Sequence, residues 1–148
     1  MDKYIIDGGR PLYGKVKAMR SKNATLPILA AALLADSGVT TLSDVPDLRD
    51  IDIMLQVLRE LGAKVEWDRQ TRTVKIEAAA LDKDEAPYDL VRKMRASFLV
   101  LGALIGRLHR ARVSLPGGCS LGQRPVNLHL KGFAQLGVDI TEEAGYVV

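Results

Sequence analysis

At residues 58–65 the chain reads LRELGAKV, and at residues 133–140 it reads FAQLGVDI. Both stretches contain the end of an apolar-periodic segment, a Leu-Gly stop and the beginning of an alternating segment, 75 residues apart. A second pair of similar stretches joins AALL at residues 31–34 to GALI at residues 102–105. The sequence therefore predicts two copies of one helix–strand–helix–hairpin unit.

Hydrophobic periodicity and turn residues place the elements of each copy within an α+β fold. For the first copy, residues 22–80, they predict a helix at about 24–35 with Asn23 as its N-cap, a strand at 39–42, a helix at 49–61 and a hairpin of 63–67 with 72–76. For the second, residues 81–148, they predict a helix at 88–108, a strand at 112–115, a helix from Pro125 and a hairpin of 138–140 with 146–148. Before the first copy, residues 4–6 and 15–17 are expected to be short strands.

The first helix of each copy is apolar on nearly every side. Residues 28–35 read ILAAALLA and residues 98–106 read FLVLGALIG. Helices of this kind are buried on most faces, and two hairpins offer too little surface to cover two of them. We therefore expect this chain to be part of a larger structure.

The composition indicates a globular protein of one ordinary domain and excludes several functional classes. Of 148 residues, 47% are hydrophobic and 26% charged, and the formal net charge is +3. That charge is too small to indicate nucleic-acid binding, and the longest apolar runs are too short to span a membrane. One cysteine and two histidines make a zinc site improbable and suit a reducing compartment. We expect a cytoplasmic location.

Cys119 lies in a glycine-rich loop, PGGCSLG at residues 116–122. Most single cysteines are small buried hydrophobic residues, and that remains one interpretation. The other is a reactive thiol, because glycines leave a side chain accessible, and Arg124 and a predicted helix start lie nearby, where positive charge lowers a thiol pKa. The loop matches neither the dinucleotide-binding fingerprint nor the P-loop.

Three further polar residues stand where a ligand could bind. Lys22 and Asn23 are at the expected mouth of the first helix, where they could cap the helix or bind an anion or a sugar. Arg95 lies among apolar residues of the predicted 88–108 helix. It could form a structural salt bridge, with Asp89 or Asp52, or bind a phosphate or carboxylate. His109 and His129 are expected to be surface or structural residues.

Five motifs together resemble one family of enzymes. They are SKNA at 21–24, PYDLV at 87–91, MRAS at 94–97, SLPGGC at 114–119 and RPVNLH at 124–129. They resemble the UDP-N-acetylglucosamine 1-carboxyvinyltransferase (enolpyruvyl transferase) family, whose members are about three times as long. The resemblance implies transfer of the enolpyruvyl group of phosphoenolpyruvate to the 3′-hydroxyl of UDP-N-acetylglucosamine, without a metal or organic cofactor, as the first committed step of peptidoglycan synthesis.

The resemblance also implies a fold and a domain organisation. The fold is an inverse barrel of two domains, each built of three helix–strand–helix–hairpin units with helices inside and sheets outside. This chain would supply two units of one domain, and residues 1–21 would be strands of the second domain, which is absent here. The missing C-terminal part of the chain would then be its essential partner, and the 148 residues alone would be inactive.

The resemblance assigns roles residue by residue. Cys119 corresponds to the cysteine that protonates phosphoenolpyruvate, can add to it covalently and reacts with epoxides of the fosfomycin type. Arg95, Arg124 and Lys22 correspond to ligands of the phosphate group, and Asn23 to a residue at the reacting sugar. The segment expected to bind uridine comprises Pro125, Val126, Asn127 and Leu128.

Two departures from the family pattern bear on substrate binding. Asn127 replaces a usual aspartate, and Arg20-Ser21 stand where the family has a glycine before Lys22, which could crowd the site. The related shikimate-pathway synthase lacks the Gly-Gly-Cys loop, so Cys119 argues against that enzyme. The alternative to catalysis is a truncated or divergent module that binds a UDP-sugar and turns nothing over.

Overall fold

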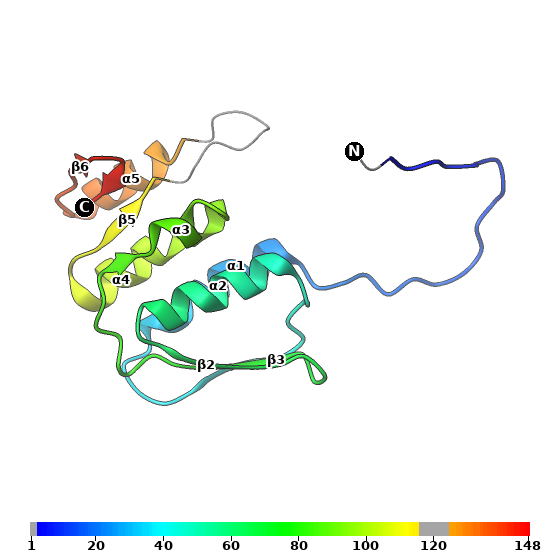
Figure 1. The fold of residues 1–148 in the computed structure, drawn as a ribbon, viewed down its shortest axis with the longest axis horizontal. Coiled ribbons are helices and arrows are strands. Elements are labelled where there is room, and N and C mark those ends of the chain that lie inside the picture. Colours follow the sequence, from blue (N-terminus) through cyan, green and yellow to red (C-terminus); the bar gives the residue numbers. More distant parts are fainter. Residues whose placement is uncertain (1–2, 116–124) are drawn as a thin grey trace.

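The computed structural model describes residues 3–115 and 125–148 (Figure 1). Its first half contains α1 (Lys22–Ala31), the 3₁₀ turn η1 (Ala32–Leu34), β1 (Thr40–Leu42), α2 (Arg49–Glu60), β2 (Lys64–Asp68) and β3 (Thr73–Glu77). Its second half contains β4 (Glu85–Ala86), α3 (Tyr88–Val91), the 3₁₀ turn η2 (Arg95–Leu99), α4 (Val100–Leu108), β5 (Arg112–Ser114), α5 (Asn127–Gln135), β6 (Glu142–Glu143) and β7 (Tyr146–Val147). The α+β class is confirmed.

The two halves form separate sheets with a shared pairing rule. The first sheet has the order β1-β3-β2, with Thr40 opposite Ile76 and Trp67 opposite Val74. The second has the order β4-β5-β7-β6, in which β5 is antiparallel to β7 and β4 is parallel to β5. In both halves the strand between the two helices pairs with the last strand of the hairpin, so the repeated topology predicted from the sequence is confirmed.

The apolar helices form the centre of the core. Leu29 of α1, Leu33 of η1 and Leu104 of α4 have no exposed surface, and α4 packs against both α1 and η1. α2 is amphipathic and buries one side, which carries Ile51, Met54, Leu55 and Leu58. Because α1 packs on α2 as well as on α4, it is covered on several faces, as its composition predicts.

The expected helix at 88–108 is interrupted. α3 ends at Val91, and Met94 takes an extended conformation (φ −149°, ψ 113°) before η2 begins at Arg95. The prediction was wrong because the apolar spacing continues across the break: Val91, Met94 and Phe98 are all buried. Burial alone does not distinguish a continuous helix from two short ones packed on the same core.

Residues 4–6 and 15–17 are not strands in this structure, which does not include the second domain whose sheet they are expected to join. The segment 3–20 has no regular secondary structure and extends away from the helices (Figure 1). Tyr4, Leu12 and Val16 are each more than 90% exposed. A β-strand needs a hydrogen-bonded neighbour, and no strand in the described part of the chain pairs with this segment.

The second hairpin is shifted along the chain from its expected position. Its first strand is β6 at 142–143 rather than 138–140, and Thr141 exchanges two backbone hydrogen bonds of 2.9 Å with Val148. The turn explains the shift: Ala144 (φ 49°) and Gly145 (φ 84°) both take the left-handed conformation that a tight two-residue turn requires. The turn therefore fixes the strand register.

Gly62 and Gly137, the equivalent glycines of the two repeats, provide a matched test of backbone strain. Both have positive φ, +105° and +87°. A Cβ on Gly62 would lie 2.9 Å from the Ala80 carbonyl oxygen, whereas one on Gly137 would meet nothing within 4 Å. We expect Gly137→Ala to lower the free energy of unfolding by about 1 kcal/mol from the left-handed conformation alone. Gly62→Ala should lower it by at least about 1 kcal/mol more from the added clash.

The measurement is urea denaturation followed by Trp67 fluorescence. Equal losses in the two variants would contradict the prediction, because they would show that the segment at 80–82 moves aside freely.

Candidate functional site

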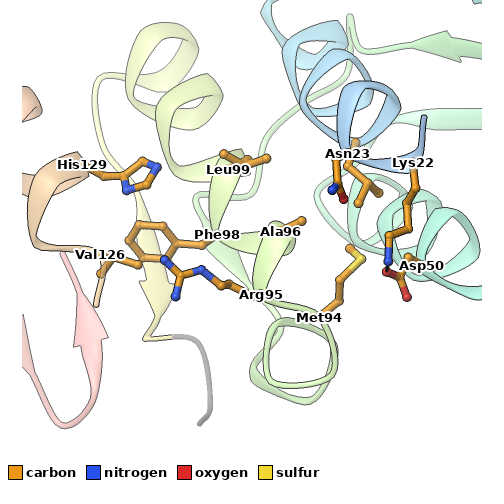
Figure 2. Close-up of a pocket in the computed structure, with 11 residues that line it drawn as sticks. Lys22, Asn23, Asp50, Met94, Arg95, Ala96, Phe98, Leu99, Val126 and His129 are labelled. Atoms are coloured by element: carbon orange, nitrogen blue, oxygen red, sulfur yellow. Dashed lines mark ion pairs between the residues drawn. The ribbon is translucent and has the colours of Figure 1, made fainter. Parts of the chain in front are cut away.

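Four helical segments begin around one cavity of about 330 Å³ (Figure 2). α1 contributes its first residue, Lys22, α2 its second, Asp50, and η2 its first, Arg95. Val126 directly precedes α5. The residues that line the cavity are Lys22, Asn23, Leu26, Asp50, Met94, Arg95, Ala96, Phe98, Leu99, Val126 and His129.

This arrangement favours an anionic ligand. The beginning of a helix carries partial positive charge and free backbone N–H groups. η2 runs directly into α4, because Leu99 and Val100 both have right-handed helical dihedral angles, so the turn at Arg95 begins a longer helical segment. The side chains of Lys22 and Arg95 add two full positive charges to the same cavity.

Lys22 forms an ion pair with Asp50 across the beginnings of α1 and α2. Its Nζ lies 2.5 Å from Asp50 Oδ2, and the two side chains are 41% and 33% exposed. The sequence predicts Lys22 and Asn23 at a helix mouth, and both line the cavity. Asp50 was not predicted to be a site residue. Its only sequence signal is its place in the first turn of an amphipathic helix, where acidic residues also occur simply because they interact favourably with the helix dipole.

Ser21, not Asn23, caps α1. The Ser21 hydroxyl accepts a hydrogen bond of 3.3 Å from the Ala24 N–H, and its carbonyl accepts one of 2.9 Å from Thr25 Oγ1. Asn23 is therefore within the helix, with its side chain at the cavity (Figure 2). The cap lies two residues earlier than predicted because serine and asparagine are both good N-caps and sequence alone ranks them similarly.

Arg95 joins η2 to the segment before α5. Its guanidinium donates a hydrogen bond of 3.1 Å from Nη2 to the Pro125 carbonyl oxygen. The two acids considered as its partners pair elsewhere: Asp52 lies 2.6 Å from Arg69, and Asp89 lies 3.2 Å from Arg92. Arg95 thus lies beside residues 125–126, which the resemblance assigns to the segment that binds uridine.

His129 also lines the cavity, which the sequence analysis did not predict. Its ring meets Phe98 edge-on, with ring centroids 6.1 Å apart and an interplanar angle of 83°. It lies three residues after Val126, one helical turn along α5, and Val126 itself is buried. The spacing could have suggested this position, but only if the buried side of α5 had been known.

The other expected site residues fall into two groups. Pro125, Asn127 and Leu128 are exposed, and Leu128 is 75% exposed and does not line the cavity. Cys119 and Arg124 lie outside the residues that the structure describes.

Arg20 and Ser21 have partners away from the cavity in the described part of the chain. Arg20 turns to the loop between β1 and α2, where its Nε and Nη2 lie 2.9 and 2.6 Å from Asp44 Oδ2. These hydrogen bonds and the positive charge of Arg20 lower the pKa of the Asp44 carboxyl group. Ser21 is occupied as the helix cap. Neither residue lines the cavity in the described part of the chain.

The described residues contain neither a metal-binding cluster nor a membrane-spanning helix. Between residues 3 and 115 and from 125 onward, no three histidine, cysteine or acidic side chains lie close enough to hold a metal ion. None of the helices in the same part of the chain is long and apolar enough to cross a membrane.

The chain is similar to known enolpyruvyl transferases in sequence and in fold. Residues 6–148 match the family profile of EPSP synthase (3-phosphoshikimate 1-carboxyvinyltransferase). The chain is 54% identical, over 99% of its length, to UDP-N-acetylglucosamine 1-carboxyvinyltransferase of Desulfosudis oleivorans, and 55% identical, over the same share, to that of Desulfatibacillum aliphaticivorans. It is also similar to the crystal structure of the enolpyruvyl transferase NikO from Streptomyces tendae, with a TM-score of 0.77, 28% identity and 95% of this chain covered.

The fold is that of the enolpyruvyl transferases. The chain belongs to the EPSP synthase family. It spans about a third of the length of its curated relatives, 34% and 35% for the two named above, and 30% of the NikO chain.

The ion pair between Arg20 and Asp44 gives stability a specific pH dependence. The pKa of Asp44 is lowered in the folded state, so the pair stabilises the fold above the unfolded-state pKa of about 3.9. That contribution is lost as the pH falls through the folded-state pKa. We expect Asp44→Asn to lower the midpoint of thermal unfolding at pH 7 and to match the wild type near pH 2.

The measurement is thermal unfolding at both pH values and at low and high salt, because an exposed pair is screened by ions. A difference between the variant and the wild type that persists unchanged at pH 2 would contradict the prediction.

Proposed function

We propose that this chain is the N-terminal part of an enolpyruvyl transferase. The reaction moves the enolpyruvyl group of phosphoenolpyruvate to the 3′-hydroxyl of UDP-N-acetylglucosamine and releases phosphate, the first committed step of peptidoglycan synthesis. The observation that carries the proposal is the cavity at which four helical segments begin with Lys22 and Arg95 on its wall, in a chain over 50% identical to enzymes named for this substrate.

The charges in the cavity fit this chemistry. Both substrates are anionic, and negative charge accumulates on the departing phosphate as its C–O bond breaks. Positive groups already fixed at that place stabilise the transition state without reorganising. Lys22 and Arg95 are such groups, and Arg124 precedes α5 by a few residues in the sequence.

The remaining roles complete the proposal. Cys119 protonates the vinylic carbon of phosphoenolpyruvate, which requires a positioned acid. Asn23 contacts the reacting sugar, and the segment from Pro125 to Leu128 binds the uridine. No metal or organic cofactor takes part. A cytoplasmic location belongs to the same proposal, because the single cysteine suits a reducing compartment.

The second substrate is proposed to be the sugar nucleotide rather than shikimate phosphate. The family profile is named for the shikimate enzyme, but the relatives above 50% identity are named for UDP-N-acetylglucosamine. A cavity of about 330 Å³ is at the lower end of the range for small-molecule sites. We therefore propose that the rest of the substrate-binding surface lies in the two thirds of the relatives' length that this chain does not cover. That part includes the domain that would pair with residues 1–21.

Arg95→Ala tests the phosphate role in a full-length transferase that carries this chain as its N-terminal part. A charge-assisted hydrogen bond contributes roughly 1.5–3 kcal/mol, so kcat/KM for phosphoenolpyruvate should fall roughly 10- to 150-fold. Phosphate release measures the rate. Arg92→Ala is the matched control, because Arg92 is three residues away, pairs with Asp89 and does not line the cavity.

Thermal unfolding of the same variants separates function from structure. If Arg95→Ala lowers stability as much as it lowers activity, the contact with Pro125 is its main role and the phosphate assignment is wrong. Binding of the sugar nucleotide without any phosphate release by the wild type would support a non-catalytic UDP-sugar-binding module instead.

Cys119 is tested by epoxide labelling and mass spectrometry on the same full-length protein. We expect an epoxide of the fosfomycin type to label Cys119, and UDP-N-acetylglucosamine to accelerate labelling because the bound sugar nucleotide excludes water and completes the site. Cys119→Ser should abolish labelling, and Cys119→Asp should retain some acid function while resisting the epoxide. An unreactive Cys119 in the folded, sugar-bound protein would return it to the buried-hydrophobe interpretation.

A further inference from the structure

We propose that Asp50 is a positioning residue that holds the Lys22 ammonium in the orientation needed for phosphate departure. The inference rests on the proposed function and adds a residue to it. Two observations support it. Asp50 is the only acidic residue among those that line the cavity in the described part of the chain, and its Oδ2 lies 2.5 Å from Lys22 Nζ.

The two side chains come from neighbouring helix beginnings. Lys22 is the first residue of α1 and Asp50 the second residue of α2, and the two helices pack against each other. Figure 2 shows the lysine side chain lying along the cavity wall with its amine at the Asp50 carboxylate. Both backbones are fixed by helices, so the pair restrains a side chain that otherwise has several rotatable bonds.

A carboxylate is an unfavourable group in an anion-binding cavity. It repels the ligand and offsets part of the positive charge of Lys22. α2 does not need Asp50 to supply negative charge at its beginning, because Asp52 is in the same first turn. Asp52 pairs with Arg69 at 2.6 Å, outside the cavity. The location of Asp50 is therefore better explained by its effect on Lys22 than by the stability of α2.

The ammonium of Lys22 has three N–H donors, so the ion pair with Asp50 on one side leaves donors for a ligand. An ammonium that is already oriented stabilises charge on the departing phosphate without first reorganising. Removing the restraint leaves the charge of Lys22 in place but lets the ammonium take other positions. Ground-state attraction of phosphoenolpyruvate should survive, and transition-state stabilisation should decrease.

Asp50→Asn tests this inference in a full-length transferase that carries this chain. The amide has nearly the same shape but no charge. We expect kcat to fall about 10- to 100-fold, the scale of a misplaced group, while KM for phosphoenolpyruvate stays equal or decreases because a negative charge has left the cavity. Asp50→Glu should recover part of kcat, since its carboxylate can still reach Lys22.

Asp52→Asn is the matched control. It neutralises an acid of the same helical turn, and the two side chains are similarly exposed, 37% for Asp52 and 33% for Asp50. The ion pair that it breaks lies outside the cavity. We expect it to change thermal stability but neither kcat nor KM. NMR of ¹³Cε-labelled lysine supplies a readout independent of turnover: the order parameter of Lys22 Cε should fall in Asp50→Asn and stay unchanged in Asp52→Asn.

The outcomes separate this inference from the proposed function. Absence of phosphate release by the wild type would overturn the proposed function. Turnover by the wild type together with an unchanged kcat or an unchanged Lys22 order parameter in Asp50→Asn would overturn the role of Asp50 alone. A raised KM at constant kcat would also overturn it, because that result describes binding rather than positioning.

Discussion

The packing of α1 against both α2 and α4 is the contact on which the rest of the structure depends. Leu26 and Leu29 of α1, together with Leu33 of η1, are almost completely buried, and α1 also contacts η2. This apolar packing brings the beginnings of α1, α2 and η2 to one cavity. Helix beginnings that repel one another electrostatically are held together because the buried leucines outweigh that repulsion.

Three basic residues then fix the acidic segment that leads into α2. Arg20 binds Asp44, Lys22 binds Asp50, and Arg69 binds both Asp47 and Asp52. Arg69 also lies over the Trp67 ring, 5.7 Å from its centroid. Each of these partly exposed pairs contributes little stability alone. Together they tie residues 44–52 to the segment before α1, to α1 itself and to the β2–β3 turn.

The two repeats share a topology but differ in their first helix, which is continuous in one and broken in the other. In the first, α1 continues into η1 without an extended residue. In the second, the extended Met94 separates α3 from η2, so Arg95 becomes the first residue of a new helical segment. Within an unbroken 88–108 helix it would lie in the middle, away from any helix beginning. The irregular repeat thus provides the second basic side chain of the cavity.

The sequence by itself predicted most of the element types, the repeat and the burial of the central helices, and it singled out Lys22, Asn23 and Arg95, which line the cavity. These follow from residue spacing, caps and motifs, which are local properties. Only the tertiary structure decided that Asp50 meets Lys22, that His129 packs on Phe98 and that Arg95 reaches Pro125, 30 residues away. Such contacts depend on how helices cross and where a helix breaks, and the side-chain packing that sets both is not local in sequence.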